Sequence, residues 1–365
     1  MSISAGPNSV VNGLLFDYDM SNTTRSWIGM PTTNYVTDPT HQLDGGEFSQ
    51  YTDLAPIFNT YGLVPYSLSM DMKSNKGGGV LVYMQNGSTS KYSFVSQSVT
   101  TTTEWQRFTF NNLTPAISDA GATAATLAFY TGYGSGINPS VKNVQVELGT
   151  FASPFVNGIR STNQSILDLA NRSTATVSNL IYASDNTFSF NGPSSSSVSV
   201  PLSTAFNKLE GTINMWVYPT AYDGGNGYFV NRDDATPNAV DWFWLGPYSG
   251  TFYFRLGNGS DCCSNDLSVG SWASYVPLNT WTNICFTWKS AGTSAIYING
   301  SLLTSRAISA VPSTNPSSNG RIGLGHANNY SFYTGKLPSA QIYNRQLTDQ
   351  EVTQNFNAYR GRYGI

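Results

Sequence analysis

Charged residues are scarce in this chain of 365 residues: Asp, Glu, Lys and Arg make up only 11% of it, against roughly 25% in an average soluble protein. The formal net charge is -3. No basic surface is therefore available to neutralise phosphates, and nucleic-acid binding is excluded as the main task. Long apolar runs are missing as well. Because no window approaches the roughly 18 consecutive apolar residues of a membrane-spanning helix, we expect no membrane partner.

Cysteine and histidine are rarer still, with three Cys and two His in the chain. Three Cys cannot form the disulfide framework of a small secreted domain, and no His or Cys spacing resembles a zinc site. Cys262 and Cys263 are adjacent, and the sequence leaves open whether one of them pairs with Cys285. The first residues also lack the basic and apolar pattern of a signal peptide. We therefore expect a protein that is made in a cytoplasm.

Aromatic residues, glycine and proline are plentiful: 13% of the chain is aromatic, and there are 34 Gly and 17 Pro. They form short apolar runs broken by turn residues, which is typical of an all-β protein. Asn299-Gly300 is a strong signal for a hairpin turn. In the second half, apolar and polar residues alternate as in strands over residues 212–217, 252–256, 281–288 and 295–298.

One helix is predicted, near the end of the chain. The four residues from Thr348 to Glu351 form a capping box, which marks the start of a helix. Val352, Phe356 and Tyr359 follow at helical spacing. We expect these three side chains to be buried against a β-sandwich.

Residues from about 34 to 157 contain a second series of alternating strands. In its first clear strand, Leu68, Met70 and Met72 share one face, as the period of two demands. Further strands are predicted at residues 80–84, 105–110, 126–130 and 144–148, with glycine-rich turns between them. This region has enough strands for a β-sandwich of its own.

Four stretches of the second half carry a family resemblance. Residues 187–192 read TFSFNG, residues 279–288 read NTWTNICFTW, residues 296–300 read IYING, and residues 335–351 read GKLPSAQIYNRQLTDQE. Together they resemble the strand motifs of laminin-G-like or concanavalin A-like jelly rolls. The tail after residue 355 is similar to the ending of this fold in many bacteriophage virion proteins.

The opening strand of this jelly roll is separated from the rest. Residues 13–19 read GLLFDYD and resemble the first strand of the phage-type domain, whose next loop is similar to residues 167–172. Residues 144–156, which lie between them, resemble the ending of carbohydrate-binding-module-type jelly rolls in phage fibres.

Insertions at exposed turns are tolerated when their ends lie close together. We therefore expect an all-β protein of two antiparallel β-sandwich (jelly-roll) domains with a short C-terminal helix. Residues 1–30 and 159–365 form the laminin-G-like sandwich, and residues 31–158 form an inserted carbohydrate-binding-module-like sandwich.

Candidate catalytic groups are few. Glycosidases need a pair of carboxylates, and no Glu has an acidic neighbour at strand spacing. Asp17 and Asp19 are two residues apart on the predicted first strand, and we interpret them as solvent-facing. His41 and His326 lie in no nucleophile motif. The sequence therefore predicts no enzyme activity.

Aromatic side chains with polar neighbours are the candidates for sugar binding. Trp242 and Trp244 share a face of a predicted strand next to Asp241; the alternative is that the two rings pack in the core or at a subunit interface. A second set lies in a glycine-rich loop and comprises Tyr130, Tyr133 and Asn138.

Calcium is the one cofactor that the resemblance brings in, because related laminin-G-like domains sometimes bind it through an Asp and loop carbonyls. Calcium prefers oxygen ligands. The candidate ligands are loop carboxylates, for which simple solvation is the alternative: Asp233, Asp234 and Asp261.

The sequence favours a non-catalytic structural protein of a phage virion, located on the virion surface as a capsid decoration protein or a short appendage. The alternative is a tail-fibre or receptor-binding lectin that recognises host surface polysaccharide. The expected partners are other capsid or tail proteins and further copies of this chain, with a trimer as the first guess. A host surface glycan is the remaining partner under consideration.

Overall fold

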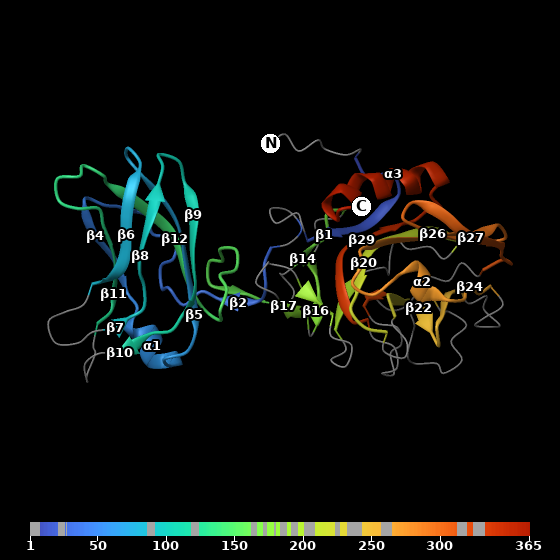
Figure 1. Cartoon of the computed structure of the whole chain (residues 1–365), viewed down its shortest axis with the longest axis horizontal. Coiled ribbons are helices and arrows are strands. Elements are labelled where there is room, and N and C mark those ends of the chain that lie inside the picture. Colours follow the sequence, from blue (N-terminus) through green and yellow to red (C-terminus); the bar gives the residue numbers. More distant parts are fainter. Residues whose placement is uncertain are drawn as a thin grey trace. The chain divides into compact units, whose positions relative to one another are not determined.

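The fold is described from a computed structural model of the chain. The structure describes residues 8–20, 26, 28–85, 92–117, 124–161, 166–170, 174–178, 180–182, 188–190, 196–200, 209–222, 227–231, 243–256, 265–311, 320–323 and 333–365. The chain divides into two compact units. Residues 30–161 form one, which we call the inserted unit, and residues 1–29 with 162–365 form the other, which we call the discontinuous unit (Figure 1).

The inserted unit is built from two four-stranded antiparallel sheets. In strand order, the first sheet contains β4 (Phe48–Asp53), β11 (Thr126–Tyr130), β6 (Gly78–Gln85) and β8 (Ser96–Thr101). The second contains β3 (Leu43–Asp44), β12 (Pro139–Leu148), β5 (Tyr66–Ser74) and β9 (Gln106–Leu113). Smaller elements are α1 (Ala55–Tyr61), the pair β7 (Tyr92–Ser93) with β10 (Ala116–Ile117), and the pair β2 (Thr32–Thr33) with β13 (Ile159–Arg160).

The core of the inserted unit lies between its two sheets. Leu68, Met70 and Met72 of β5 are fully buried there together with Val82 of β6 and Phe129 of β11. The period-two alternation predicted for these strands is thus confirmed, because it places one apolar face of each sheet against the other.

The two ends of the inserted unit are tied together by a buried carboxylate. Glu147 on β12 accepts four hydrogen bonds: from the Ser153 backbone N–H at 2.6 Å, the Ser153 hydroxyl at 2.8 Å, the Thr32 hydroxyl at 2.6 Å and the Gln145 amide at 2.7 Å. The guanidinium of Arg160 donates to the Pro154 carbonyl at 2.6 Å. Buried charge is tolerated only with such partners. The motif around residues 144–156 therefore closes the unit where the chain enters and leaves it.

The discontinuous unit is a sandwich of a six-stranded and a seven-stranded sheet, in which the strand pairs are antiparallel. In strand order, the six-stranded sheet contains β1 (Leu14–Asp19), β29 (Gly335–Tyr343), β20 (Glu210–Pro219), β25 (Thr282–Lys289), β26 (Thr293–Ile298) and β27 (Ser301–Ala307).

The seven-stranded sheet completes the sandwich. It contains β16 (Val177–Ser178), β19 (Ser197–Val200), β28 (Gly320–Ile322), β21 (Phe229–Asn231), β22 (Phe243–Tyr248), β23 (Thr251–Leu256) and β24 (Leu267–Val269). Short elements are the pair β14 (Ile166–Leu167) with β15 (Thr174–Ala175), the pair β17 (Ile181–Tyr182) with β18 (Phe188–Ser189), and α2 (Trp272–Tyr275).

The first strand is joined to chain that follows the inserted unit. β1 pairs with β29. Asp168 accepts the backbone N–H of Asp17 at 2.9 Å, and the Leu169 N–H donates to the Asp17 carbonyl at 2.7 Å. The hydroxyl of Ser26 donates to the Leu167 carbonyl at 2.9 Å. Residues 167–169 thus lie directly beside β1, although the whole inserted unit separates them in sequence.

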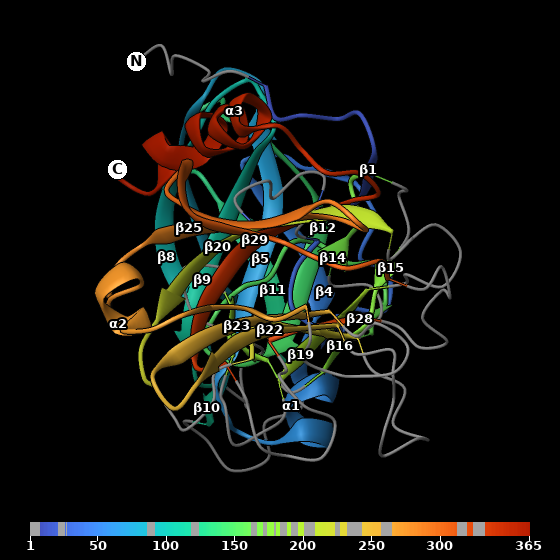
Figure 2. The ribbon, with the colours of Figure 1, turned by 90° about the vertical axis from the view of Figure 1, so that its right-hand side faces the viewer.

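The C-terminal helix α3 (Asp349–Tyr359) covers the outer face of the six-stranded sheet (Figure 2). It begins at the predicted capping box, in which Thr348 and Glu351 bond reciprocally. Val352, Phe356 and Tyr359 are buried as predicted, and the ring of Phe356 stacks on Trp216 at 5.7 Å. A 3₁₀ turn at Arg360–Arg362 continues the helix. The prediction of an antiparallel all-β jelly roll with a short C-terminal helix is confirmed.

The structure also shows the conformation of the Asn299-Gly300 turn and the state of Cys285. Asn299 and Gly300 both have positive φ, 49° and 76°, which the favoured two-residue hairpin turn requires, and they join β26 to β27. Cys285 on β25 is a buried free thiol, so it takes no part in the disulfide that the sequence left open. Cys262 and Cys263 lie outside the described residues.

Candidate functional site

The inserted unit presents three tyrosines close together, which we call the tyrosine surface: Tyr83 on β6, Tyr130 at the end of β11 and Tyr133 in the loop that follows. The rings of Tyr130 and Tyr133 meet edge to face at 5.4 Å. The pKa of Tyr83 is raised, first by its partial burial and then by the nearby hydroxyls of Tyr133 and Tyr130. Tyr133 is 79% exposed, so its ring is available to a ligand.

The loop that carries Tyr133 is held by a carboxylate from a distant part of the chain. Glu47 accepts hydrogen bonds from the backbone N–H groups of Gly134, at 2.7 Å, and Gly136. These two bonds lower the pKa of Glu47 below its usual 4.5, because they stabilise the ionised form. Gly134 and Gly136 have φ of 84° and 64°, a backbone conformation that glycine adopts without strain.

The far end of the same loop is held by a second set of contacts. The Asn138 backbone N–H donates to the side-chain carbonyl of Asn75 at 2.9 Å. The ammonium group of Lys76 donates to the Ser135 carbonyl at 2.6 Å. Because both ends of the loop are bonded to neighbouring residues, Tyr133 is presented by a fixed backbone, and little loop ordering is needed when a ligand binds.

An exposed aromatic ring on a fixed support is suited to a sugar, because its apolar face covers the C–H groups of a pyranose while polar neighbours bond the hydroxyls. The sequence found Tyr130, Tyr133 and Asn138. It did not find Tyr83 or Glu47, because only strand pairing and loop closure bring these residues beside the loop.

The other predicted sugar-binding set is less accessible where the structure describes it. Trp244 on β22 is only 7% exposed. Its ring lies 6.1 Å from that of Tyr253 and 5.3 Å from the guanidinium of Arg255, which leaves little free area for a sugar. Asp241 and Trp242 lie outside the described residues, so the role of this set stays a prediction.

The predicted calcium ligands, Asp233, Asp234 and Asp261, also lie outside the described residues. Within the part of the chain that the structure describes, no group of three or more His, Cys, Asp or Glu side chains is placed to hold a metal ion. In that same part, no helix is both long and apolar enough to cross a membrane.

The interpretation of Asp17 and Asp19 as solvent-facing is wrong. The two residues are 6% and 3% exposed, because the C-terminal segment covers this face of β1, where Arg362 forms an ion pair with Asp19. Burial, and then the negative charges of Asp19 and Asp168, raise the pKa of Asp17 to about 7. The first strand thus carries a buried carboxyl, whose Oδ1 has no hydrogen-bond partner among the described residues.

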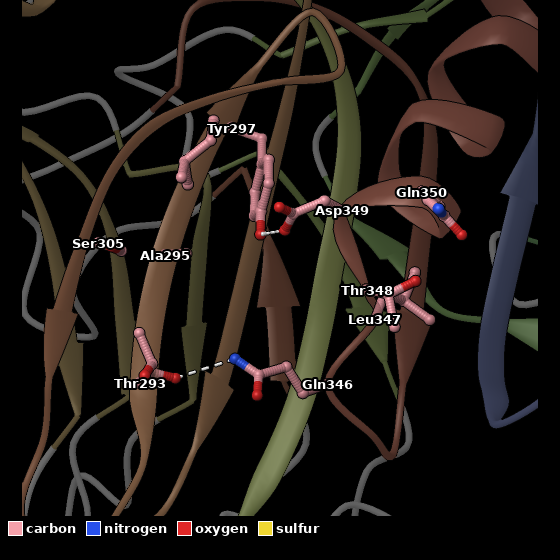
Figure 3. A pocket seen from close by; sticks show the side chains of 10 residues that line it. Thr293, Ala295, Tyr297, Ser305, Gln346, Leu347, Thr348, Asp349 and Gln350 are labelled. Carbon is pink, nitrogen blue, oxygen red and sulfur yellow. Dashed lines mark hydrogen bonds between the residues drawn. The ribbon is translucent and has the colours of Figure 1, made fainter.

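A groove lies on the outer face of the discontinuous unit, and we call it the helix-start groove (Figure 3). Its volume is about 620 Å³, inside the range of small-molecule sites. The Tyr297 hydroxyl donates to Asp349 Oδ1 at 2.6 Å, and the Gln346 amide donates to the Thr293 carbonyl at 2.9 Å. β26, β27 and the start of α3 supply its lining: Thr293, Ala295, Tyr297, Leu302, Ser305, Gln346, Leu347, Thr348, Asp349 and Gln350.

The fold and these sites define a lectin-like β-sandwich protein. The family model of the Concanavalin A-like lectin/glucanases superfamily matches residues 155–353, which is more than half of the chain. The chain therefore belongs to this superfamily.

Individual relatives match shorter or more distant stretches. The chain is 30% identical over 113 residues to the human adhesion G-protein coupled receptor D1, a stretch that spans 30% of this chain and 13% of the receptor. It is similar to the binding domain of Paraclostridial Mosquitocidal Protein 1, with 20% identity and a TM-score of 0.42 over 53% of this chain and 49% of that one. It is also similar to the CBM40 of the Ruminococcus gnavus IT-sialidase, solved with α2,3-sialyllactose, with 17% identity and a TM-score of 0.33 over 40% of this chain and 80% of that one.

Proposed function

We propose that this protein is a non-catalytic lectin that recognises host surface glycans through the tyrosine surface of its inserted unit. The observation that carries the proposal is the ring of Tyr133, exposed over 79% of its surface on a loop that Glu47 and Asn75 hold in place. Membership of a superfamily that contains lectins, matched over residues 155–353, supports the lectin class of the protein; the place of the site rests on Tyr133 alone. Tyr is enriched at recognition sites because it offers a large apolar face with little rotamer entropy to lose.

Acidic residues with structural roles support the absence of catalysis. Glu47 holds the Tyr133 loop, Glu147 ties the ends of the inserted unit, and Glu351 caps α3 and pairs with Arg345. Asp17 and Asp19, which have strand spacing, are buried beneath the C-terminal segment. A glycosidase needs two carboxylates that flank a bound glycosidic bond. In the described part of the chain, the burial of Asp17 and Asp19 keeps them from contacting such a bond.

The setting of this lectin stays a prediction from the resemblance to phage proteins. We favour a receptor-binding role on the virion surface over capsid decoration, because lectin-type recognition fits the exposed ring of Tyr133 better. The carbohydrate-binding-module-like character of the inserted unit belongs to the same proposal. Contacts with other capsid or tail proteins, and assembly as a homo-oligomer such as a trimer, are expected on this view and are checked by solution mass and by locating the protein in particles.

The experiment is a glycan array of bacterial surface polysaccharides, probed with the full chain and with Tyr133→Ala. Tyr61→Ala is the matched control, because Tyr61 is also an exposed tyrosine of the inserted unit, at 46%. We expect the full chain and the control to bind the same glycans, Tyr133→Ala to lose them, and no reducing ends to be released. Absence of binding by the full chain, equal binding by Tyr133→Ala, or release of reducing ends contradicts the proposal.

A further inference from the structure

We propose that the helix-start groove of the discontinuous unit is a second sugar site, which takes one or two rings of a neutral, hydroxyl-rich glycan. The inference rests on the proposed function, because it assumes that the ligand of this protein is a glycan. It assigns a separate site in the other unit, so the two sites can be tested independently.

The size of the groove fits such a ligand. Its volume of about 620 Å³ is in the middle of the range of roughly 300–1,000 Å³ that small-molecule sites occupy. Figure 3 shows how it is built: Thr293 and Tyr297 come from β26, Gln346 comes from the segment before α3, and Asp349 is the first residue of that helix. A ligand between these elements contacts two different parts of the fold.

The charge of the lining selects against an anionic ligand. Neither Lys nor Arg is among its residues, and its one ionisable carboxylate is that of Asp349. A uronate, sialate or phosphate would be repelled by this carboxylate without a cation to compensate. A neutral sugar instead donates its hydroxyl protons to such an oxygen, which forms a charge-assisted hydrogen bond.

Two polar side chains of the groove, Asp349 and Gln346, are held in place before a ligand arrives. The hydroxyl of the buried Tyr297 donates a hydrogen bond to Asp349 Oδ1. No described residue donates to Asp349 Oδ2, so this oxygen is available to a ligand. Gln346 donates its amide N–H to the Thr293 carbonyl, which leaves the amide oxygen as an acceptor. The hydroxyl of Ser305 adds a donor from β27. Acceptors that are fixed in this way lower the entropic cost of binding.

The groove also has apolar surface for the C–H face of a sugar. Two apolar side chains line it: Ala295 on β26, which is 4% exposed, and Leu302 on β27, which is 51% exposed. A single exposed Leu is ordinary on a protein surface. Here it lies beside convergent polar groups, a combination that is typical of small-molecule sites.

The test compares variants of the full chain in titrations with maltose, cellobiose and lactose as neutral probes and glucuronic acid as the anionic probe. Ser305→Trp fills the groove, and Ser301→Trp is the matched control, because Ser301 is exposed on the same strand and does not line the groove. Asp349→Asn keeps the shape of the side chain and removes its charge. Methyl NMR signals of Ala295 and Leu302 report directly on occupancy.

We expect at least one neutral probe to shift both methyl signals and glucuronic acid to shift neither. Asp349→Asn should weaken that binding about tenfold to a hundredfold, as expected for a hydrogen bond to a charged group. Ser305→Trp should abolish it, and Ser301→Trp and Tyr133→Ala should preserve it. Should Ser305→Trp fail to fold, Asp349→Asn alone decides.

Three results overturn the groove site. The first is that no neutral probe moves the Ala295 and Leu302 signals, and the second is that Asp349→Asn binds as well as the full chain. The third is that sugar binding is lost with Tyr133→Ala and unaffected by Ser305→Trp, which leaves the proposed function intact and rejects this site. If the glycan array is also negative, both proposals fail.

Discussion

Replacing the buried Asp17 with Asn should stabilise the discontinuous unit at neutral pH. In the folded chain the pKa of Asp17 is about 7, against a usual 3.8, so the folded state holds a proton that the unfolded state releases. Stability is therefore highest when this carboxyl is protonated, and it is lost as the pH rises from 3.8 towards 7. Asn resembles the protonated side chain and does not titrate.

The magnitude follows from the size of the shift. One pKa unit corresponds to about 1.4 kcal/mol, so a shift of about three units sets an upper limit of about 4 kcal/mol at pH above 7. The Gln341 side chain bonds the Asp17 carboxylate, and part of that bond is lost in Asp17→Asn. We therefore expect a gain of about 2–4 kcal/mol near pH 8 and almost none near pH 4.

Urea unfolding followed by tryptophan fluorescence measures this change, because Trp216, Trp272 and Trp288 are fully buried in the discontinuous unit. The control is Asp38→Asn, which changes an exposed carboxylate of the inserted unit and should leave the transition unmoved. The reasoning is refuted if Asp17→Asn lowers stability near pH 8, or if its effect is the same at both pH values.

Three further predictions concern the helix, the ends of the inserted unit and the tyrosine loop. Phe356→Ala should cost about 3–5 kcal/mol in urea unfolding, because the ring is buried on Trp216; an unchanged urea midpoint contradicts the packing described. Glu147→Ala removes the carboxylate that accepts four hydrogen bonds and should destabilise the inserted unit by about 3 kcal/mol or more; hydrogen exchange at the β12 amides checks this, and unchanged exchange contradicts it. Glu47→Gln should speed hydrogen exchange at the Gly134 amide, and equal exchange in the variant and the full chain contradicts this role. In the full chain, exchange at this amide should speed up only as the pH falls below the usual Glu pKa of 4.5, because the pKa of Glu47 in the folded state is lower.

Much of the fold was predictable because period-two alternation and turn chemistry are local. The strands around Leu68 and Phe254, the Asn299-Gly300 turn and the capping box at Thr348 are each encoded within a few residues, and the structure contains all four. Burial of Asp17 was not predictable in this way. Alternation places the Asp17 side chain on the face away from the sandwich core. This face is buried only because α3 packs over it in the folded chain.

The candidate site was likewise predictable only where its residues are close together in the sequence. Tyr130 and Tyr133 stand out in sequence because they lie in a glycine-rich loop. The carboxylate that holds this loop comes from Glu47, and the helix-start groove joins strands near residue 300 to a segment near residue 348. Contacts between such distant positions carry no local sequence signal, so they depended on the structure.

The central claim is that the exposed ring of Tyr133 binds a glycan, and the most direct measurement compares Tyr133→Phe with Tyr133→Ala in titrations with a glycan identified on the array. If the ring face carries the contact, Tyr133→Phe should keep affinity within about threefold of the full chain, and Tyr133→Ala should lose about thirtyfold, the effect of removing about 2 kcal/mol of contact. Equal affinities of Tyr133→Ala and the full chain, or an equal loss in both variants, would contradict the account.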